Sequence, residues 1–299
     1  MTEPKLIAVG AVCYTTLYRV DTVPALPAKA VASAACRVVD GMAISAAAAF
    51  AKLGGEADVW ARIGDDAVGA TMVSELQAAG LGVTALRRVA GATSSHAAVV
   101  IDQAGDRLVV PYHQPDLDAD PAWLPLAEIA AADVVHADIR WPDGAAAALA
   151  HAQRLGVRTM LDAEVGPRDV LARLLPLASH AVFSDAGLAA FTGEADLEQG
   201  LRAVAAWHPG HVGASCGADG YAWIETGVIH RVPALPVEVI DTLAAGDVFH
   251  GAFALALAEG QPIAAAARFA CVAASLKCTR FGGRLGCPTR AEVAAAVAG

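Results

Sequence analysis

Short apolar runs of strand length alternate with alanine-rich segments of helical length along most of this chain, and this alternation restricts the fold more than any other feature. The apolar runs that predict strands cover 5–12, 57–64, 82–89, 133–139, 157–163, 180–185 and 211–217. Helices are expected between them over 43–55, 65–80, 143–156, 167–178 and 196–207. Strands and helices that alternate in this way form a parallel sheet covered by helices on both faces. The sequence therefore predicts an α/β fold.

Two hairpins break this pattern. The first covers 94–112 and turns at 103–106, and the second covers 220–235 and turns at Thr226–Gly227. A strand-like segment over 14–39 is interrupted by prolines. We expect this segment and the first hairpin to form a small β lid over about 13–40 and 94–113. Since no low-complexity linker divides the chain, residues 1–299 are expected to form a single domain.

The charge balance restricts the partners. The 299 residues carry 21 Lys and Arg against 31 Asp and Glu, a formal charge of −10. This acidity argues against nucleic acid and anionic membranes as main partners, but a local site can still be basic. The apolar stretches are shorter than the roughly 20 residues that span a membrane, and no secretory signal is visible. We expect a cytoplasmic protein whose six cysteines are reduced.

The most informative stretch is 239–260. A strand-like run leads to Asp241 and Thr242, a turn of small residues follows, and Asp247 opens a long apolar helix. The first turn of a helix carries N–H groups without internal partners, and its dipole end is positive, so small residues there let a phosphate approach the backbone. Asp247 could accept a proton beside that anion. Alternatively, Asp247 is only a helix acid that interacts with the dipole.

The segment DTLAAGDVFHG (Asp241–Gly251) resembles the C-terminal signature of the ribokinase-like (PfkB-type) carbohydrate kinases, Asp-Thr-x-Gly/Ala-Ala-Gly-Asp. RIGDDAVG (Arg62–Gly69) and the hairpin after Ser94 are similar to other segments of that family. The resemblance implies a ribokinase-like three-layer α/β/α sandwich with a mostly parallel central sheet and a small β lid. It also implies an ATP-dependent sugar kinase that uses ATP and Mg2+ and forms a homodimer through the lid.

The resemblance assigns roles to individual residues. Asp247 is the catalytic base, the backbone of Ala245, Gly246 and Asp247 forms the anion hole, and Asp241 and Thr242 help to organise phosphate and metal. The residues expected at the nucleotide are Ser215, Gly217, Gly220, Thr279 and Gly282. Those expected at the substrate are Thr15, Lys29, Asp40, Gly41, His113 and Arg140. Carboxylates that could hold Mg2+ through water are Asp162, Glu164 and Asp185.

Within this family the segments around Arg140 and Arg284 are most similar to the sulfofructose kinases, which phosphorylate the C1 hydroxyl of 6-deoxy-6-sulfofructose. Arg140 stands where that subgroup holds the sulfonate, and a guanidinium suits a tetrahedral anion. The alternative for Arg140 is a loop salt bridge with Asp138 or Asp143. The resemblance therefore implies phosphoryl transfer to a primary hydroxyl of a ketose-like sugar.

The departures from the family pattern lie on the sugar side. Thr15 stands where the family has a sugar-binding Asp, and Asp40 replaces a Gly. Asp40 could take over hydroxyl binding, or it could be a simple turn residue. Pro111 replaces an Asn of the subgroup, and Ser184 and Gly187 replace the family's Asn-x-x-Glu pair. The alternatives are therefore a kinase of fructose, ribose, a nucleoside or a sugar acid such as 2-keto-3-deoxygluconate, or a non-catalytic nucleotide-binding homologue.

The histidines show no spacing typical of a metal site. Surface or packing roles are expected for His151, His180, His208, His211 and His230. His250 follows the start of the long helix, and we expect a core histidine with its hydrogen bonds satisfied. His113 and Gln114, at the exit of the first hairpin, are better candidates for substrate contact.

Overall fold

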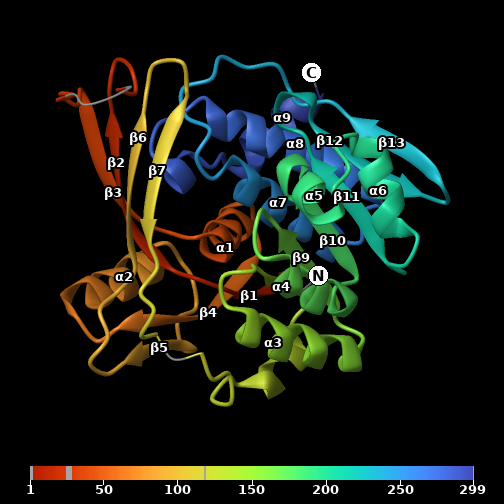
Figure 1. Ribbon diagram of the computed structural model, residues 1–299, viewed down its shortest axis with the longest axis horizontal. Coiled ribbons are helices and arrows are strands. Elements are labelled where there is room, and N and C mark those ends of the chain that lie inside the picture. The colour runs from red at the N-terminus through yellow and green to blue at the C-terminus, as the bar shows by residue number, and fades with distance from the viewer. Residues whose placement is uncertain (1–2, 25–28, 118, 299) are drawn as a thin grey trace.

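The computed structural model describes residues 3–24, 29–117 and 119–298. Within these residues the strands form a nine-stranded sheet in the order β13-β12-β11-β10-β9-β8-β1-β4-β5 and a four-stranded sheet in the order β3-β2-β6-β7. Figure 1 shows the small sheet standing at one side of the large one. Residues 25–28, which the predicted lid range includes, lie outside the described residues.

The large sheet is parallel from β5 to β11. Its strands are β1 (Lys5–Val9), β4 (Glu56–Gly64), β5 (Leu86–Val89), β8 (Val134–Ala137), β9 (Arg158–Ala163), β10 (His180–Ser184), β11 (His211–Ser215), β12 (Tyr221–Glu225) and β13 (Val228–Val232). β12 and β13 are the second predicted hairpin, and they add an antiparallel edge to β11. The central strands are apolar on both sides because neither face meets water.

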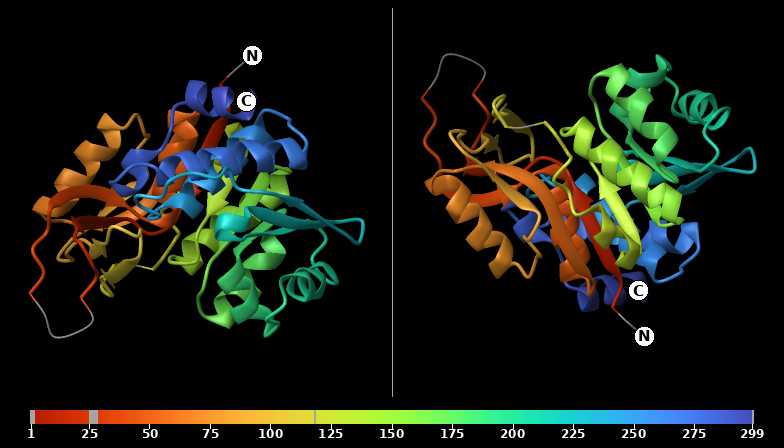
Figure 2. Two further views of the ribbon diagram at one scale, coloured as in Figure 1. Left: turned by 90° about the horizontal axis from the view of Figure 1, so that it is seen from above. Right: turned by 90° about the horizontal axis from the view of Figure 1, so that it is seen from below.

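Helices cover both faces of the large sheet. One face carries α1 (Met42–Lys52), α2 (Ala67–Ala78), α7 (Ala245–Ala258), α8 (Ile263–Cys278) and α9 (Arg290–Ala298). The other carries α3 (Pro142–Leu155), α4 (Arg168–Leu174), α5 (Asp185–Thr192) and α6 (Leu197–Ala205). Figure 2 shows the blue C-terminal helices and the green helices on opposite sides of the strands. Successive residues of β1 therefore enter different cores: Leu6 and Ala8 pack under α1 and α7, while Ile7 and Val9 pack toward α3.

The small sheet is made of the segments predicted for the lid. β2 (Cys13–Arg19) pairs antiparallel with β3 (Ala34–Asp40) and parallel with β6 (His96–Ile101), which pairs antiparallel with β7 (Arg107–Tyr112). Its inner face buries Leu17, Val38, Val99 and Ile101 against Leu243 and Phe281. Its outer face leaves large apolar side chains in water: Tyr18, Leu108, Val110 and Tyr112.

Most of the predicted elements are confirmed, and the α/β/α architecture with them. The short helix α5 was not expected, although Ser184 caps it by accepting the Gly187 N–H and Gly193 ends it in a left-handed conformation. Helices α8 and α9 also lay outside the predicted set. The strand expected before Asp241 is wrong: the N–H groups of Ile240 and Asp241 donate to the Cys278 carbonyl at the end of α8 instead of entering a sheet.

Short 3-10 turns connect several of these elements. They are η1 (Leu126–Ala131), η2 (Leu175–Leu177), η3 (Gly217–Asp219) and η4 (Gly283–Gly286). The six cysteines, all within the described ranges, are free thiols, as expected. No helix among the described residues combines the length and the hydropathy that crossing a bilayer would require.

Candidate active site

The first turn of α7 forms an open anion hole. Ala244 precedes it in the left-handed region (φ 62°), a costly conformation for a residue with a Cβ. The Ala245 N–H donates to the Thr242 carbonyl at 3.2 Å. In the part of the chain that the structure describes, the N–H groups of Gly246 and Asp247 have no acceptor, and a Cβ added at Gly246 would meet nothing within 4 Å. Of the three predicted amides, two are therefore available to an anion, and that of Ala245 is already engaged.

Asp247 lies among other carboxylates at the C-terminal edge of the sheet. Burial, and then the charges of Asp162, Asp40, Asp138 and Glu164 in that order, raise its pKa well above the usual value for an aspartate. Burial and the neighbouring Glu164 and Asp138 raise the pKa of Asp162 in the same way. A basic Asp247 beside two free amides is suited to accepting a proton from an alcohol, and the acidic surroundings favour the binding of cations.

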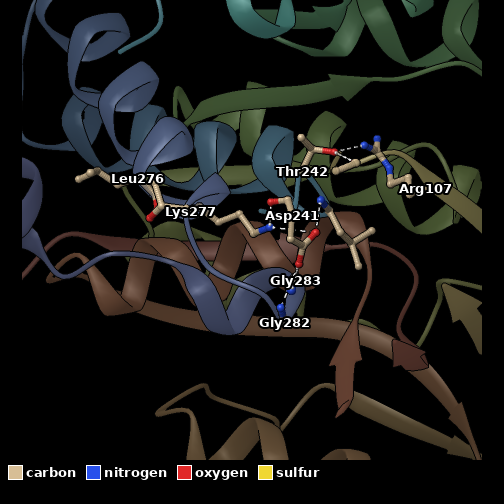
Figure 3. A network of polar contacts seen from close by, with 10 residues as sticks. Arg107, Asp241, Thr242, Leu276, Lys277, Gly282 and Gly283 are labelled. Carbon is tan, nitrogen blue, oxygen red and sulfur yellow. Dashed lines mark hydrogen bonds and ion pairs between the residues drawn. The ribbon is translucent and has the colours of Figure 1, made fainter. Parts of the chain in front are cut away.

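Asp241 connects three segments below this turn (Figure 3). Its Oδ2 accepts the N–H groups of Gly282 and Gly283 at 2.9 Å each, and its Oδ1 accepts that of Leu243 at 2.7 Å. Lys277 of α8 places Nζ 2.6 Å from the Asp241 carbonyl and 3.4 Å from Oδ1. Because the Asp241 side chain is fully buried and both oxygens are engaged, direct contact with phosphate or metal does not fit. It organises the loop instead.

Thr242 links this loop to the tip of the small sheet. Its hydroxyl donates to the Gly105 carbonyl at 3.4 Å and accepts a hydrogen bond from Arg107. Figure 3 shows Arg107 reaching from the β6–β7 hairpin to Thr242. The hairpin tip is therefore held next to the start of α7.

Two of the predicted sugar-binding residues, Asp40 and Gly41, lie where β3 passes into α1. Gly41 has φ 133°, and a Cβ there would lie 2.3 Å from the Ala11 carbonyl oxygen, so only glycine fits. Asp40 is buried and accepts a hydrogen bond from Ser45. Asp138, at the end of β8, accepts the N–H groups of Ala11 and Ala43 on the same carboxylate oxygen. Asp138 thus fixes the loop after β1 to the start of α1.

Thr15 and Lys29 are placed differently. Thr15 is 3% exposed on the inner face of β2, in register with Val38 and Ala97. Lys29 is exposed in the connection that leads to β3. Their roles in substrate binding stay predictions.

A pocket of about 230 Å³ opens beside this junction. It is lined by Ala11, Val12, Arg62, Ser95, His113, Gln114, Pro115, Leu117, Ala119, Arg140, Trp141, Pro142 and Asp143. The Arg62 guanidinium lies 4.2 Å from the centre of the Trp141 ring. Burial, and then the positive charge of Arg140, lower the pKa of His113. The pocket therefore gathers three of the predicted substrate-contact residues, His113, Gln114 and Arg140, together with Arg62, which the sequence indicated only as part of a family motif.

Arg140 does not form the loop salt bridge that was the alternative to substrate binding. Its guanidinium donates to the Val165 carbonyl at 3.4 Å, while its backbone N–H donates to Asp138. Asp143 pairs with Arg173 at 2.7 Å. Within the described residues, no ion pair joins the Arg140 side chain to Asp138 or Asp143.

Some of the residues predicted to bind the nucleotide border free space, and others are already used in packing or in hydrogen bonds within the chain. Ser215 ends β11, and at Gly217 (φ 54°) an added Cβ would meet nothing within 4 Å. A Cβ at Gly220 would lie 2.1 Å from the Val232 carbonyl oxygen, so this glycine is required by packing. Thr279 donates its hydroxyl to the Leu276 carbonyl, and the Gly282 N–H is used by Asp241. Nucleotide contacts by these five residues stay predictions.

The carboxylates proposed for Mg2+ do not share one cluster of direct ligands. Glu164 accepts the Ser184 hydroxyl at 2.8 Å, and Asp185 accepts the Ala186 N–H at the exposed start of α5. Asp162 is instead close to His250, with Oδ1 3.4 Å from Nε2. Water-mediated binding by these residues remains a prediction that suits their oxygen donors.

His250 corrects an expectation. It is 3% exposed, but its Nδ1 finds no hydrogen-bond partner in the part of the chain that the structure describes, so not all of its hydrogen bonds are satisfied. His136, which no sequence pattern indicated, is fully buried on β8, and neither of its ring nitrogens has a hydrogen-bond partner among the described residues. His136 was missed because its neighbour His250 lies on a distant helix, and no local spacing signals this contact.

The comparisons with known proteins agree with this architecture. The family model for the pfkB family carbohydrate kinases matches residues 5–290. The chain is 29% identical over 259 residues to a ribokinase of Bacillus subtilis, 86% of each chain. It is 27% identical over 300 residues to an ATP-dependent ribose-1-phosphate kinase of Halopiger xanaduensis, 97% of each chain.

Among solved structures, a putative ribokinase from Agrobacterium tumefaciens superimposes with a TM-score of 0.96. The two sequences are 37% identical, and the match covers 99% of this chain and 98% of the other. The open helix start and Asp247 thus occur in a fold whose relatives phosphorylate sugars. The chain belongs to the pfkB family of carbohydrate kinases and is an ATP-dependent sugar kinase.

Proposed function

We propose that this kinase phosphorylates a primary hydroxyl of a ketose-like sugar that carries an anionic group, with 6-deoxy-6-sulfofructose as the leading candidate. The observation that carries the proposal is the pocket beside Gly41, whose lining includes Arg62, Arg140 and His113. Guanidinium groups hold tetrahedral anions through paired hydrogen bonds. The chain carries a net charge of −10. Arginines that gather at one pocket of such an acidic protein favour the binding of an anion there.

The names of the relatives suggest two classes of substrate, one anionic and one neutral. The Halopiger xanaduensis protein is named for ribose 1-phosphate, a sugar that carries a phosphate. The name of the Bacillus subtilis relative, ribokinase, favours neutral ribose as the second candidate. The arginines of the pocket distinguish the two, because a neutral pentose offers them no charge to bind.

Asp247 would accept the proton of the sugar hydroxyl, and the N–H groups of Gly246 and Asp247 would bind the transferred phosphoryl group. The preorganised helix start would stabilise the charge that develops there. Glu164 and Asp185 would hold Mg2+ through water, and the ion would neutralise the phosphates of ATP. The small sheet would act as a lid that excludes water from the reaction.

The test is an ADP-release assay across sulfofructose, fructose, ribose, nucleosides and 2-keto-3-deoxygluconate, with wild type, Arg140→Ala and the exposed control Arg154→Ala. We expect the anionic ketose to give the highest kcat/KM. Arg140→Ala should lower that value about 10- to 100-fold, as expected for the loss of charge-assisted hydrogen bonds. The values for neutral sugars and those of Arg154→Ala should stay unchanged. A preference for neutral ribose together with no effect of Arg140→Ala would contradict the proposal. If none of these acceptors yielded ADP, the proposed substrate class would be wrong.

We also propose that two copies of the chain associate through the outer faces of their small sheets. Leu108, Val110 and Tyr112 lie on one side of β7 at every second residue, and 48%, 57% and 48% of their surfaces are exposed. Tyr18 of β2 lies on the same face because it is in register with Val100, the partner of Leu108. An exposed apolar face on a sheet with an open edge strand is typical of an interface between copies.

A further inference from the structure

A buried group of two histidines and one aspartate lies under the first turns of α7. His136 on β8, Asp162 on β9 and His250 on α7 offer one ligand atom each, all within 4.8 Å of one another. Val134 and Met160, two residues before His136 and Asp162, face the core under α1 and α7, so both side chains project toward α7. We propose that His136, Asp162 and His250 bind a divalent transition metal, of the zinc class, that fastens α7 to the sheet.

The His136 ring has the strongest signal of a missing ligand. Among the residues that the structure describes, neither nitrogen of His136 has a hydrogen-bond partner, although the residue is 0% exposed. Buried polar atoms are almost always paired, so a metal bound to one nitrogen of His136 and to Nε2 of His250 would give the His136 ring the partner that it lacks. The rings meet edge to face, with centroids 5.4 Å apart and planes inclined by 65°, and do not stack.

The spacing between His250 and Asp162 fits a metal bound by nitrogen and oxygen. Two ligands at about 2.1 Å from a tetrahedral metal are about 3.4 Å apart. Nε2 of His250 and Oδ1 of Asp162 are 3.4 Å apart. Neutral imidazole with a carboxylate suits Zn2+ and its neighbours, whereas Mg2+ prefers oxygen ligands only. Three protein ligands leave one position of a tetrahedron for a water.

The surroundings of the group contain both signs of charge. The carboxylates of Glu164 and Asp138 and the guanidinium of Arg140 lie near Asp162. His250 is three residues after Asp247 on the same helix, so a metal at His250 would fix the face of α7 that presents Asp247. The proposal is independent of which sugar the enzyme phosphorylates.

The experiment is metal analysis of the untagged protein grown in zinc-supplemented medium and passed through a desalting column in excess Mg2+. We expect about one equivalent of transition metal per chain. His136→Gln and His250→Gln should reduce it at least tenfold, with folding checked by circular dichroism. The control is His208→Gln, because His208 is equally buried but both of its nitrogens are hydrogen-bonded within the chain, to Leu175 and Gly210.

Two measurements on the wild-type protein avoid any dependence on variant folding. Replacement by Co2+ should give visible absorption bands of a four-coordinate ion. Anomalous scattering from a crystal at the zinc edge should peak between His136, Asp162 and His250. A melting temperature that rises by several degrees when Zn2+ is added back to chelated protein would add support. Less than about 0.1 equivalent of metal per chain, or ordered water alone between the three side chains, would overturn the proposal.

Discussion

Asp247 has to be basic enough to accept a proton and yet be ionised when the substrate binds. Its pKa is raised by burial and by the neighbouring carboxylates. We expect Asp247→Asn to lower kcat about 10²- to 10⁴-fold, the usual cost of removing a general base, with little change in the affinity for ATP. Steady-state ADP release and ATP titration by calorimetry measure the two effects. Turnover at the wild-type level would show that Asp247 is only a helix acid.

The same substitution tests the direction of the pKa shift at Asp247. A carboxyl group with a raised pKa in the folded state binds its proton more tightly than in the unfolded chain. Its stabilising contribution is therefore complete below the unfolded pKa of about 3.8 and is lost as the pH rises through the raised value. Asn cannot ionise, so Asp247→Asn should melt at a higher temperature than wild type at pH 7.5. That advantage should shrink toward pH 4, and an advantage that grows on acidification would contradict the assigned shift.

Individual residues could be predicted from the sequence where their neighbours in the chain carry the signal. Asp247 and the predicted anion hole fall in one contiguous motif, so the start of α7, at Ala245, was predicted to within two residues. Arg62 contacts Trp141, and His136 contacts His250. Each partner lies far away in the sequence, so no local pattern predicts these contacts. The hydrogen bond from the Ala245 N–H to the Thr242 carbonyl likewise depends on the conformation of one turn, which composition does not predict.

At the scale of elements, Lys277 and Asp241 fasten the end of α8 and the loop at Gly282 to the turn before α7. Both side chains are fully buried. Removing one partner of a buried pair leaves a charge without compensation, so Lys277→Met should lower the free energy of unfolding by about 3–5 kcal/mol. The double variant Asp241→Asn/Lys277→Met should recover part of that loss. Urea unfolding measures both, and a loss under about 1 kcal/mol for the single variant would contradict this role.

Helix α7 also depends on its close approach to α1. A Cβ at Gly251 would lie 2.2 Å from the Ala46 carbonyl oxygen of α1. Helix propensity alone predicts that Gly251→Ala gains up to about 1 kcal/mol, whereas overpacking predicts a loss of about 1–3 kcal/mol. We expect the loss, measured by urea unfolding, together with a lower kcat because α7 carries Asp247. A gain in stability would mean that the two helices separate easily.

The elements themselves show why part of the fold was predictable. Strand runs and alanine-rich helices carry periodic signals, and each predicted hairpin was found. The segment before Asp241 has the composition of a strand, but its N–H groups bond to the end of α8, so tertiary contacts override the local preference. Helix α5 is short and is specified mainly by its caps, Ser184 and Gly193, which a periodicity search does not detect.

At the scale of the whole molecule, the outer face of the small sheet leaves large apolar side chains exposed to water. Val110, in the middle of the edge strand β7, is 57% exposed. If two chains pair through this face, Val110→Lys should convert a dimer into a monomer, because a buried ammonium without a partner opposes association. Val228→Lys on β13 is the matched control, a valine of similar exposure (54%) on an edge strand far along the large sheet. Sedimentation velocity at micromolar concentration measures the oligomeric state of each protein.

Since the hairpin tip also touches Thr242, the monomeric variant should show a raised KM for the sugar with little change in kcat. A wild-type protein that sediments as a monomer, or a Val110→Lys protein that remains a dimer, would exclude this face as the interface.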